Sequence, residues 1–334
     1  MLDTLESERA PTSEVAAVLV KDVGVVGAGP SSLFTLKALR DRGLTATAIE
    51  RAGASGGIWA RDRPDSPVYE NLVSNSTKRL TAVSSHAFDD EVDEFPRRED
   101  FTNYLDSYCT KFALEADIFF NTYVDSTVRD CDNHWNVTVS QSNGTQSNLH
   151  EKFRALVVAT GMSSFPVTPK YPKSDPGSGR YIHASEYWSP NSFVRSRNAH
   201  VLIVGLSTSA LDIAIDLARS SRVSRVTICA RSSRFIVPRM LNGSPFSDSA
   251  RHPVDPLTFS ESVFPRLSWR RRRKVIQSFL QSLGNSYVTA EQLGFDKPSY
   301  APWHRTLSIS DDIRPYLESG AIEIVQGNVD PTTG

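Results

Sequence analysis

Hydrophobic and polar positions along the chain describe the same local pattern twice. In the stretch VGVVGAGPSSLFTLKALRDRGLTATAIE, residues 23 to 50, an apolar strand leads into a glycine turn, a helix and a second apolar strand. Within the predicted helix Leu33, Leu36 and Leu39 recur at helical spacing, and Gly43 stands where a glycine commonly ends a helix. This order predicts a strand–turn–helix–strand unit with parallel strands.

The order returns in HVLIVGLSTSALDIAIDLARSSRVSRVTICAR, residues 200 to 231. Its helix carries Leu211, Ile213, Ile215 and Leu217. Each unit of this kind opens a doubly wound parallel sheet that binds a dinucleotide. The two copies therefore predict an α/β fold with two Rossmann-like dinucleotide-binding domains.

The first turn has the spacing of a GxGxxG fingerprint, with Gly27 and Gly29 in the first two positions and Ser32 in the third. In this pattern the first glycine makes the turn, the second lets a pyrophosphate reach the backbone, and the third permits close packing of helix and strand. Serine is small and affects only the third role. We predict that the phosphates lie at the helix amino terminus, beside Pro30 and Ser31, because the helix dipole and the free N–H groups of the first turn after the proline favour negative charge.

The second turn departs from the fingerprint, since Gly205, Ser207 and Ala210 occupy its three positions. The middle glycine is lost, so close approach of a ligand to the backbone is less favoured there. Ser207 and Ser209 are the predicted contacts of this turn with phosphate groups.

The residues that end the second strand of each unit differ in charge. Glu50 follows the first turn at close to the spacing of ~20 residues that is expected of a carboxylate that binds ribose hydroxyl groups. Arg231, with Arg234 close behind, occupies the corresponding place in the second unit. A carboxylate repels a 2′-phosphate and an arginine binds it. The first site is therefore predicted to suit FAD and the second NADPH; the alternative is that both arginines are only solvated.

Composition agrees with an ordinary globular protein. The chain has 334 residues, of which 39% are apolar and 22% charged, values that suit about two domains with substantial cores. A net charge of −1 gives no electrostatic reason to expect nucleic acid as a partner. No apolar run approaches the ~18–20 residues that span a bilayer, and the first residues are acidic where a secretory signal is basic. We expect a cytoplasmic location and no membrane span.

Metal and thiol chemistry are not indicated. The three cysteines, Cys109, Cys131 and Cys229, include no CxxC pair and are too scattered for a zinc site or a disulfide framework. We therefore expect no bound metal.

The segment ERAGASGGIW, residues 50 to 59, resembles the stretch that follows the ribose-binding acid in flavin-containing monooxygenases. In that family the glycines of GGxW let the chain pass close to FAD, so Gly57 and Trp59 become candidate FAD contacts. The segment YENLVSNSTKRL, residues 69 to 80, is similar to a further family segment, with Asn75 and Lys78 in place.

The resemblance extends along residues 20 to 328. FPRREDFTNYLDSYCTKF, residues 95 to 112, looks like the helix after the first flavin loop. FRALVVATG, residues 153 to 161, resembles the strand that returns the chain to the cofactor, which adds Thr160 and Gly161 to the candidate contacts.

GSGRYIHASEYW, residues 177 to 188, is the most specific match. It is similar to the family pattern FxGxxxHxxx(Y/F), with Gly177 in place of phenylalanine, followed by Gly179, His183 and Tyr187. The resemblance implies that His183 supports domain linkage and cofactor handling. Ketone-oxygenating relatives usually carry tryptophan where Tyr187 stands.

The resemblance implies an FAD- and NADPH-dependent monooxygenase. In the family NADPH reduces FAD, O₂ then forms a flavin C4a-hydroperoxide, and a nitrogen or sulfur atom of a small molecule is oxygenated. Asn75 is the candidate catalytic amide, because an amide side chain both donates and accepts hydrogen bonds. The alternatives are a ketone oxygenase of the Baeyer–Villiger type and an uncoupled or non-catalytic flavin-binding protein. Oligomeric state stays open.

The family's domain order predicts an FAD domain at residues 20–165 and 312–334, with an NADPH domain inserted at 166–311 and an extension at 1–19. AIEIV is predicted to be a strand after a turn at Gly320. The family continues beyond this strand, so we expect the carboxyl-terminal part of the FAD domain to be shortened.

The basic stretch WRRRRK, residues 269 to 274, is predicted to open a helix capped by Ser268. Its core stripe is predicted to consist of Val275, Ile276, Phe279, Leu280 and Leu283. We interpret the basic residues as a solvated face.

Overall fold

The computed structural model describes residues 20–60, 66–141, 149–163, 165–168, 180–241, 244–245, 268–294, 298, 300 and 307–329. The chain divides into two compact units, Met1–Gly57 with Cys109–Met162 and Ile58–Tyr108 with Ser163–Gly334. Each unit contains one of the two glycine turns. The predicted extension at 1–19, Gly177 and Gly179 lie outside the described residues.

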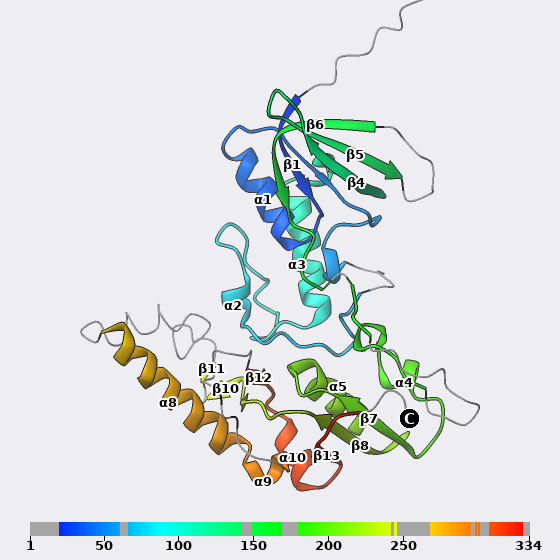
Figure 1. The fold of residues 1–334 in the computed structure, drawn as a ribbon, viewed down its shortest axis with the longest axis vertical. Helices are drawn as coiled ribbons and strands as arrows, with labels where there is room; N and C mark the ends of the chain where they lie inside the picture. Colours follow the sequence, from blue (N-terminus) through cyan, green and yellow to red (C-terminus); the bar gives the residue numbers. More distant parts are fainter. Residues whose placement is uncertain are drawn as a thin grey trace, which may run out of the picture. The chain divides into compact units, whose positions relative to one another are not determined.

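The first unit is built on a six-stranded sheet with the order β3-β2-β1-β6-β5-β4. Figure 1 labels β1, β4, β5 and β6 of this sheet. β3, β2, β1 and β6 pair in parallel. β5 pairs antiparallel with both of its neighbours, β6 and β4. The carboxyl ends of the parallel strands meet at one edge, which is where a doubly wound sheet binds its ligand. The strands are β1 Val20–Val26, β2 Ala46–Ile49, β3 Ile118–Phe119, β4 Thr122–Arg129, β5 Trp135–Gln141 and β6 Leu149–Val158.

The first turn connects β1 to helix α1, Pro30–Arg40, as predicted. Leu33 and Leu36 of this helix are fully buried, which is the burial that their helical spacing predicts. Gly43, predicted to end the helix, has a φ of +74° shortly after Arg40. On the sheet, the ring of Phe153 packs so closely on Gly24 that a Cβ at Gly24 would lie 2.7 Å from it.

The second unit contains a parallel three-stranded sheet with the order β13-β8-β7. β7, Ala199–Val204, leads through the second turn to α5, Thr208–Ala218, and then to β8, Val223–Ala230. β13, Ile322–Gln326, is the strand predicted after Gly320, and it lies beside β8. The structure thus has two separate sheets, and in each of them one strand leads through a glycine turn into a helix. This confirms the predicted fold.

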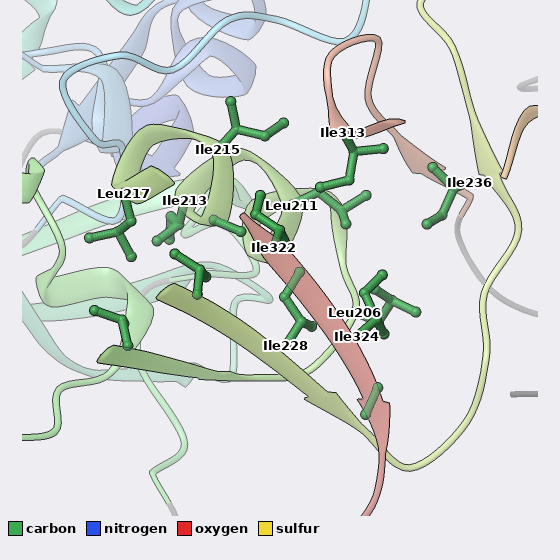
Figure 2. Close-up of a cluster of buried hydrophobic side chains, with 14 of the residues drawn as sticks. Leu206, Leu211, Ile213, Ile215, Leu217, Ile228, Ile236, Ile313, Ile322 and Ile324 are labelled. Atoms are coloured by element: carbon green, nitrogen blue, oxygen red, sulfur yellow. The ribbon is translucent and has the colours of Figure 1, made fainter. Parts of the chain in front are cut away.

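The core of the second unit lies between α5 and this sheet. Figure 2 shows the side chains that fill it, drawn from the helix, from β8 and β13 and from the segments around them. Leu211 and Ile228 are fully buried, and Ile322 is nearly so. The apolar spacing that predicted the helix therefore marks the face that packs on the strands.

Two small sheets and further helices complete the described chain. The small sheets pair β12, Ser308–Ile309, with β9, Ile236–Val237, and β10, Met240–Leu241, with β11, Ser244–Pro245. The remaining helices are η1 Gly57–Trp59, α2 Lys78–Thr81, α3 Arg98–Lys111, η2 Glu115–Asp117, η3 Ala184–Glu186, α4 Pro190–Phe193, α8 Trp269–Tyr287, α9 Ala290–Leu293 and α10 Ile313–Glu318.

Helix α8 begins after Ser268, as predicted, but the Ser268 side chain makes no capping hydrogen bond. Its predicted core stripe is partly wrong. Leu280 is buried, whereas Val275 and Phe279 are 40% and 41% exposed. The second half of the helix packs on the small cluster around Val237, through Leu280 and Leu283, and no described side chain of the first half belongs to that cluster. The side chain of Ile276 lies outside the described part of the chain.

The domain bounds derived from the sequence stay a prediction. The structure groups residues 58–108 with the second unit. Among the described residues, no helix has both the length and the apolar character that a membrane crossing requires.

Candidate functional site

The first turn is formed by backbone that approaches other backbone closely. Gly27 has a φ of +104°, and a Cβ placed on it would lie 2.7 Å from the carbonyl oxygen of Ala159. Gly57 has a φ of +62°, and its Cβ would lie 2.9 Å from the Cα of Gly29. Real Cβ atoms do not adopt such distances, so glycine is required at both positions.

Glycine also leaves the amino end of α1 open. Gly29 is the N-cap and makes no side-chain capping bond, Pro30 begins the helix, and Ser31 is exposed. The first N–H groups of a helix lack intrahelical partners and attract anions. The predicted phosphate contacts at Gly29, Pro30 and Ser31 therefore lie together at one helix end.

Glu50 lies next to this turn, as its sequence position predicts. It is 5% exposed, and its two carboxylate oxygens accept hydrogen bonds from the backbone N–H groups of Ala28 at 2.7 Å and Ala52 at 2.8 Å. Each carboxylate oxygen has a second lone pair that can accept a bond from a ribose hydroxyl group. Glu50 thus has a structural role in the turn as well as its predicted role in binding.

The GGIW segment continues from the same turn. The Gly56 N–H group donates to the Ala28 carbonyl oxygen at 2.8 Å, which brings the segment alongside the turn. Gly57 begins helix η1, which ends at Trp59. The Trp59 ring packs on Phe101 at 4.4 Å between centroids, and its carbonyl oxygen accepts from the Thr102 hydroxyl at 2.8 Å.

β6 returns to the same edge of the first sheet. The Ala159 N–H group donates to the Val26 carbonyl oxygen at 3.0 Å, so the chain after β6 meets the end of β1. Thr160 and Gly161 are exposed there, and Gly161 has a φ of +78°. The structure therefore brings eight predicted positions of the first unit to this turn and sheet edge: Gly27, Gly29, Pro30, Ser31, Glu50, Gly57, Thr160 and Gly161.

Asn75 lies on a loop in the second unit. The Ser74 N–H group donates to the Pro96 carbonyl oxygen at 2.8 Å, and Thr77 caps helix α2. The Oδ1 atom of Asn75 is buried and makes no hydrogen bond with the described residues. A buried acceptor without a donor is costly unless a ligand or water supplies one. This atom therefore fits a site that receives a donor from a bound molecule.

Lys78, which the family pattern places near Asn75, has a defined structural role. Its ammonium group donates to the carbonyl oxygens of Asp90 at 2.9 Å and Val92 at 2.6 Å. Lys78 therefore fixes the loop that follows α2.

The second turn is more open. Gly205 has a φ of +116°, but a Cβ placed on it would meet nothing within 4 Å. Ser207 is the N-cap of α5, and its hydroxyl accepts from the Ala210 N–H group at 3.4 Å. Ser209 is exposed in the first turn of the helix. A serine at the middle fingerprint position therefore caps the helix at the place where phosphate is predicted to bind.

Strand β12 is hydrogen-bonded to the second turn. The Ser308 hydroxyl donates to the Leu206 carbonyl oxygen at 2.8 Å, and the Ile309 N–H group donates to the Thr208 hydroxyl at 3.1 Å. Arg231 is exposed immediately after β8, at the carboxyl edge of the second sheet. Its side chain therefore has access to a ligand at that edge.

His183 has a local structural role in the described chain. Its Nδ1 accepts from the Ser185 N–H group at 3.1 Å, and its backbone N–H donates to the Glu186 carboxylate at 3.0 Å. These bonds form a capping box at helix η3. Tyr187 is buried, and its hydroxyl donates to Asp216 of α5 at 2.6 Å.

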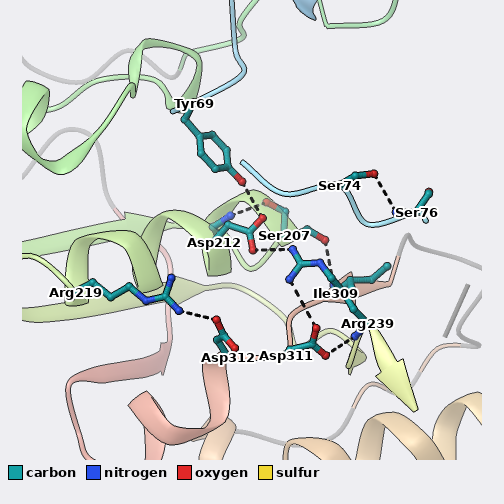
Figure 3. Close-up of polar contacts among 12 residues, drawn as sticks. Tyr69, Ser74, Ser76, Ser207, Asp212, Arg219, Arg239, Ile309, Asp311 and Asp312 are labelled. Carbon is teal, nitrogen blue, oxygen red and sulfur yellow. Dashed lines mark hydrogen bonds and ion pairs between the residues drawn. The ribbon is translucent and has the colours of Figure 1, made fainter. Parts of the chain in front are cut away.

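Sequence reasoning missed a polar network at the amino-terminal half of α5 (Figure 3). The Tyr69 hydroxyl donates to Asp212 at 2.8 Å, and the other oxygen of Asp212 lies 3.6 Å from the Arg239 guanidinium. The Arg239 backbone N–H donates to Asp311 at 2.7 Å. Asp212 and Asp216 interrupt an otherwise apolar helix, and such charges on a buried helix need partners. These charges are the signal in the sequence that partners exist, although they do not identify the partners.

Burial dominates the titration of this network. It raises the pKa of the Tyr69 phenol, and the Asp212 carboxylate raises it further. Burial also raises the pKa of Asp212, while the Arg239 guanidinium acts in the opposite direction. The Nε atom of Arg239 is buried without a partner in the described residues. The network is therefore largely buried at Tyr69, Asp212 and Arg239.

Within the described residues, Asp130, Asp132 and His134, in the turn between β4 and β5, are the one group of side chains close enough together to hold a metal ion. The Asp130 carboxylate pairs with the Lys152 ammonium at 2.8 Å and also accepts from the His134 N–H group at 2.8 Å. The hydrogen bond from Lys152 is the main reason that the pKa of Asp130 is lowered to about 2. Through these contacts Asp130 stabilises the turn between β4 and β5.

Comparison with known proteins gives one family. A family model described as flavin-binding monooxygenase-like matches residues 20–252. A probable indole-3-pyruvate monooxygenase of Arabidopsis thaliana is 29% identical over 306 residues, which cover 90% of this chain and 65% of that protein. Dimethylaniline monooxygenase [N-oxide-forming] 2 of Macaca mulatta is 30% identical over 329 residues, 92% of this chain and 56% of that protein. The chain thus spans only part of the length of these relatives.

Solved structures agree on the fold. An S-allyl-L-cysteine S-oxygenase from Allium sativum superposes with a TM-score of 0.56 at 26% identity, over 68% of this chain and 55% of that one. An oxidised steroid monooxygenase bound to NADP has a TM-score of 0.64 at 19% identity, over 92% of this chain and 66% of that one. At this lower identity the second likeness concerns the fold alone.

Proposed function

The chain belongs to the flavin-binding monooxygenase-like family, and from that premise we propose that it uses FAD and NADPH to oxygenate a nitrogen or sulfur atom of a small molecule. In such a reaction NADPH supplies two electrons, one atom of O₂ enters the substrate and the other leaves as water. Bound FAD supplies the chemistry that activates O₂. The protein supplies binding, orientation and exclusion of water.

One observation carries the proposal: the two turns differ in the space around their glycines and in the charge beside them, which supports a different dinucleotide at each. Gly27 and Gly29 leave room for a pyrophosphate at the open end of α1, beside the Glu50 carboxylate. These residues fit FAD, whose ribose hydroxyl groups donate to a carboxylate. The exposed Arg231 at the end of β8 suits the 2′-phosphate of NADPH, because a guanidinium binds phosphate through paired hydrogen bonds.

Asn75 is the residue that we assign to the reaction centre. Its buried Oδ1 has no donor among the described residues, so it is ready to accept a hydrogen bond from a bound molecule. Its amide N–H₂ group can donate at the same time. An amide in this place orients bound groups and replaces water, without taking up or releasing a proton itself.

Relatives support nitrogen or sulfur as the atom oxygenated. One curated relative is named as N-oxide-forming and one solved structure is an S-oxygenase. The likeness to cyclohexanone monooxygenase, at 17% identity, concerns the fold alone. Tyr187 stands where ketone-oxygenating relatives carry tryptophan, which also favours nitrogen or sulfur.

The test is to reconstitute the purified chain with FAD and to record its visible absorbance. NADPH oxidation is then followed with a panel of amines, sulfides and ketones, and oxygenated product is measured against hydrogen peroxide. We expect a bound flavin and an N-oxide or S-oxide as the main product. Absence of bound flavin contradicts the cofactor assignment, and a lactone or ester as the main product contradicts the proposed substrate class.

A further inference from the structure

The loop segment that carries Asn75 is attached to helix α5 by two acidic residues one helical turn apart. The Tyr69 hydroxyl donates to Asp212 at 2.8 Å, and the Asn71 side-chain amide donates to Asp216 at 2.9 Å. Residues four apart on a helix lie on the same face. The loop therefore runs along this face of α5 between Tyr69 and Asn71.

The attachment at Tyr69 is buried and charged. Tyr69 is 3% exposed and belongs to the core cluster of the second unit. Its partner Asp212 faces Arg239, which in turn binds the Asp311 carboxylate through its backbone N–H group (Figure 3). A hydrogen bond to a carboxylate in such surroundings is stronger than a neutral one at the surface. The bond therefore holds the loop to α5 at Tyr69.

Asp212 lies in the first half of α5, the helix whose amino end is the second dinucleotide turn. Asn75 follows Tyr69 on the same loop and has a buried oxygen without a partner. The network thus links a turn predicted to hold NADPH with the amide predicted to lie at the reaction centre. Both ends of this link are in the second compact unit.

We propose that Tyr69 and Asp212 are positioning residues, which hold Asn75 in a fixed place relative to the second dinucleotide turn. The proposal rests on the proposed function for the role of Asn75. The attachment itself is a property of this chain. Without it, the amide is displaced from the group that it orients, and a displacement of about 1 Å can lower a reaction rate by roughly a hundredfold.

The chain offers a matched control. Tyr187 is also a buried tyrosine whose hydroxyl donates to a carboxylate of α5, Asp216, at 2.6 Å. Tyr187 does not lie on the loop that carries Asn75. Tyr69→Phe and Tyr187→Phe therefore each remove one phenol hydroxyl that donates to α5, but only the first removes a hydrogen bond made by the loop itself.

The first measurement needs no cofactor. Hydrogen–deuterium exchange is followed by mass spectrometry on peptides covering residues 70–77 in the full chain. We expect faster exchange in Tyr69→Phe and exchange like the parent chain in Tyr187→Phe. Asp212→Asn, which keeps the shape of the side chain, is expected to resemble Tyr69→Phe and replaces it where that variant does not fold. Unchanged exchange in both Tyr69→Phe and Asp212→Asn overturns the proposal.

The second measurement is the fraction of oxidised NADPH that yields oxygenated product instead of hydrogen peroxide. We expect Tyr69→Phe to lower this fraction by roughly tenfold or more and Tyr187→Phe to leave it near the parent value. In the Asn75→Ala background Tyr69→Phe is expected to have no further effect, because the residue through which it acts is gone. An equal effect in both backgrounds overturns the proposal.

The two measurements separate the two proposals. A parent chain that binds no flavin contradicts the proposed function, and the exchange experiment still decides whether Tyr69 holds the loop. A parent chain that forms product, together with unchanged exchange in the variants, contradicts the positioning role alone.

Discussion

The two glycine turns occupy the same place in two copies of one strand–turn–helix unit, but their surroundings differ. At the first turn, a Cβ on Gly27 would lie 2.7 Å from a backbone carbonyl oxygen. At the second, a Cβ on Gly205 would meet nothing within 4 Å, although both glycines have φ above +100°. The first turn therefore needs glycine for space as well as conformation, and the second for conformation alone.

The polar groups beside the turns differ in the same way. Glu50 is buried and binds two backbone N–H groups next to the first turn. Arg231 is exposed beside the second. A buried, hydrogen-bonded carboxylate belongs to a permanently formed site, whereas an exposed arginine is available to a ligand that comes and goes. This contrast supports the proposal of an FAD that stays bound and an NADPH that exchanges in every cycle.

The largest effect is expected from Gly27→Ala. Alanine there adopts a conformation that L-residues avoid and also clashes with the Ala159 carbonyl group, so the free energy of unfolding should fall by roughly 3 kcal/mol or more. Urea unfolding measures the loss of stability, and flavin absorbance measures the loss of bound flavin. Gly205→Ala is the control, because alanine there has an unfavourable backbone conformation but no clash, which should cost roughly 1–3 kcal/mol. Equal losses in the two variants contradict the contrast between the turns.

A somewhat smaller effect is expected from Arg231→Ala. Loss of a charged hydrogen bond to the 2′-phosphate should raise the KM for NADPH by roughly tenfold to a hundredfold and leave that for NADH unchanged. Arg225→Ala is the matched control, because Arg225 is an exposed arginine of β8 that pairs with Glu323. An unchanged preference for NADPH removes Arg231 from this role.

Alkaline pH should affect the second unit through its buried phenols. Burial, followed by the nearby carboxylates Asp311 and Asp312, raises the pKa of Tyr287 to about 12. An unfolded tyrosine titrates near pH ~10, so the folded state holds the phenol proton more tightly. The stability from this group is complete below about pH 10 and is lost as pH rises through about 12. Thermal unfolding followed by circular dichroism should show a weaker alkaline decline in Tyr287→Phe; an identical decline contradicts the assignment.

Local patterns predicted the features that depend on neighbouring residues. The strand–turn–helix order, the place of Glu50 beside the first turn and the start of α8 all follow from residues close together in the sequence. The structure confirms these features. The binding roles of Glu50, Asn75 and Arg231 stay predictions.

Contacts between distant segments were not predictable in the same way. Tyr69 and Asp212 are 143 positions apart, and no periodic pattern relates them. The apolar spacing of α8 predicted a core stripe, but spacing alone does not determine how far along the helix a partner extends. Val275 and Phe279 are therefore exposed although they lie on the predicted face. Charges within an apolar helix, as in α5, indicate that partners exist but do not identify them.

The smallest effects concern the two serines that stand at glycine positions of the fingerprint, and they are expected to have opposite signs. The Ser32 hydroxyl is fully buried and makes no hydrogen bond with the described residues, so Ser32→Ala should raise the free energy of unfolding by about 1 kcal/mol. The Ser207 hydroxyl caps α5, so Ser207→Ala should lower it by roughly 0.5–1 kcal/mol. Urea unfolding of the two variants side by side measures both changes. If both variants are destabilised to the same extent, the Ser32 hydroxyl has a partner after all, and the first turn tolerates its serine in the same way as the second.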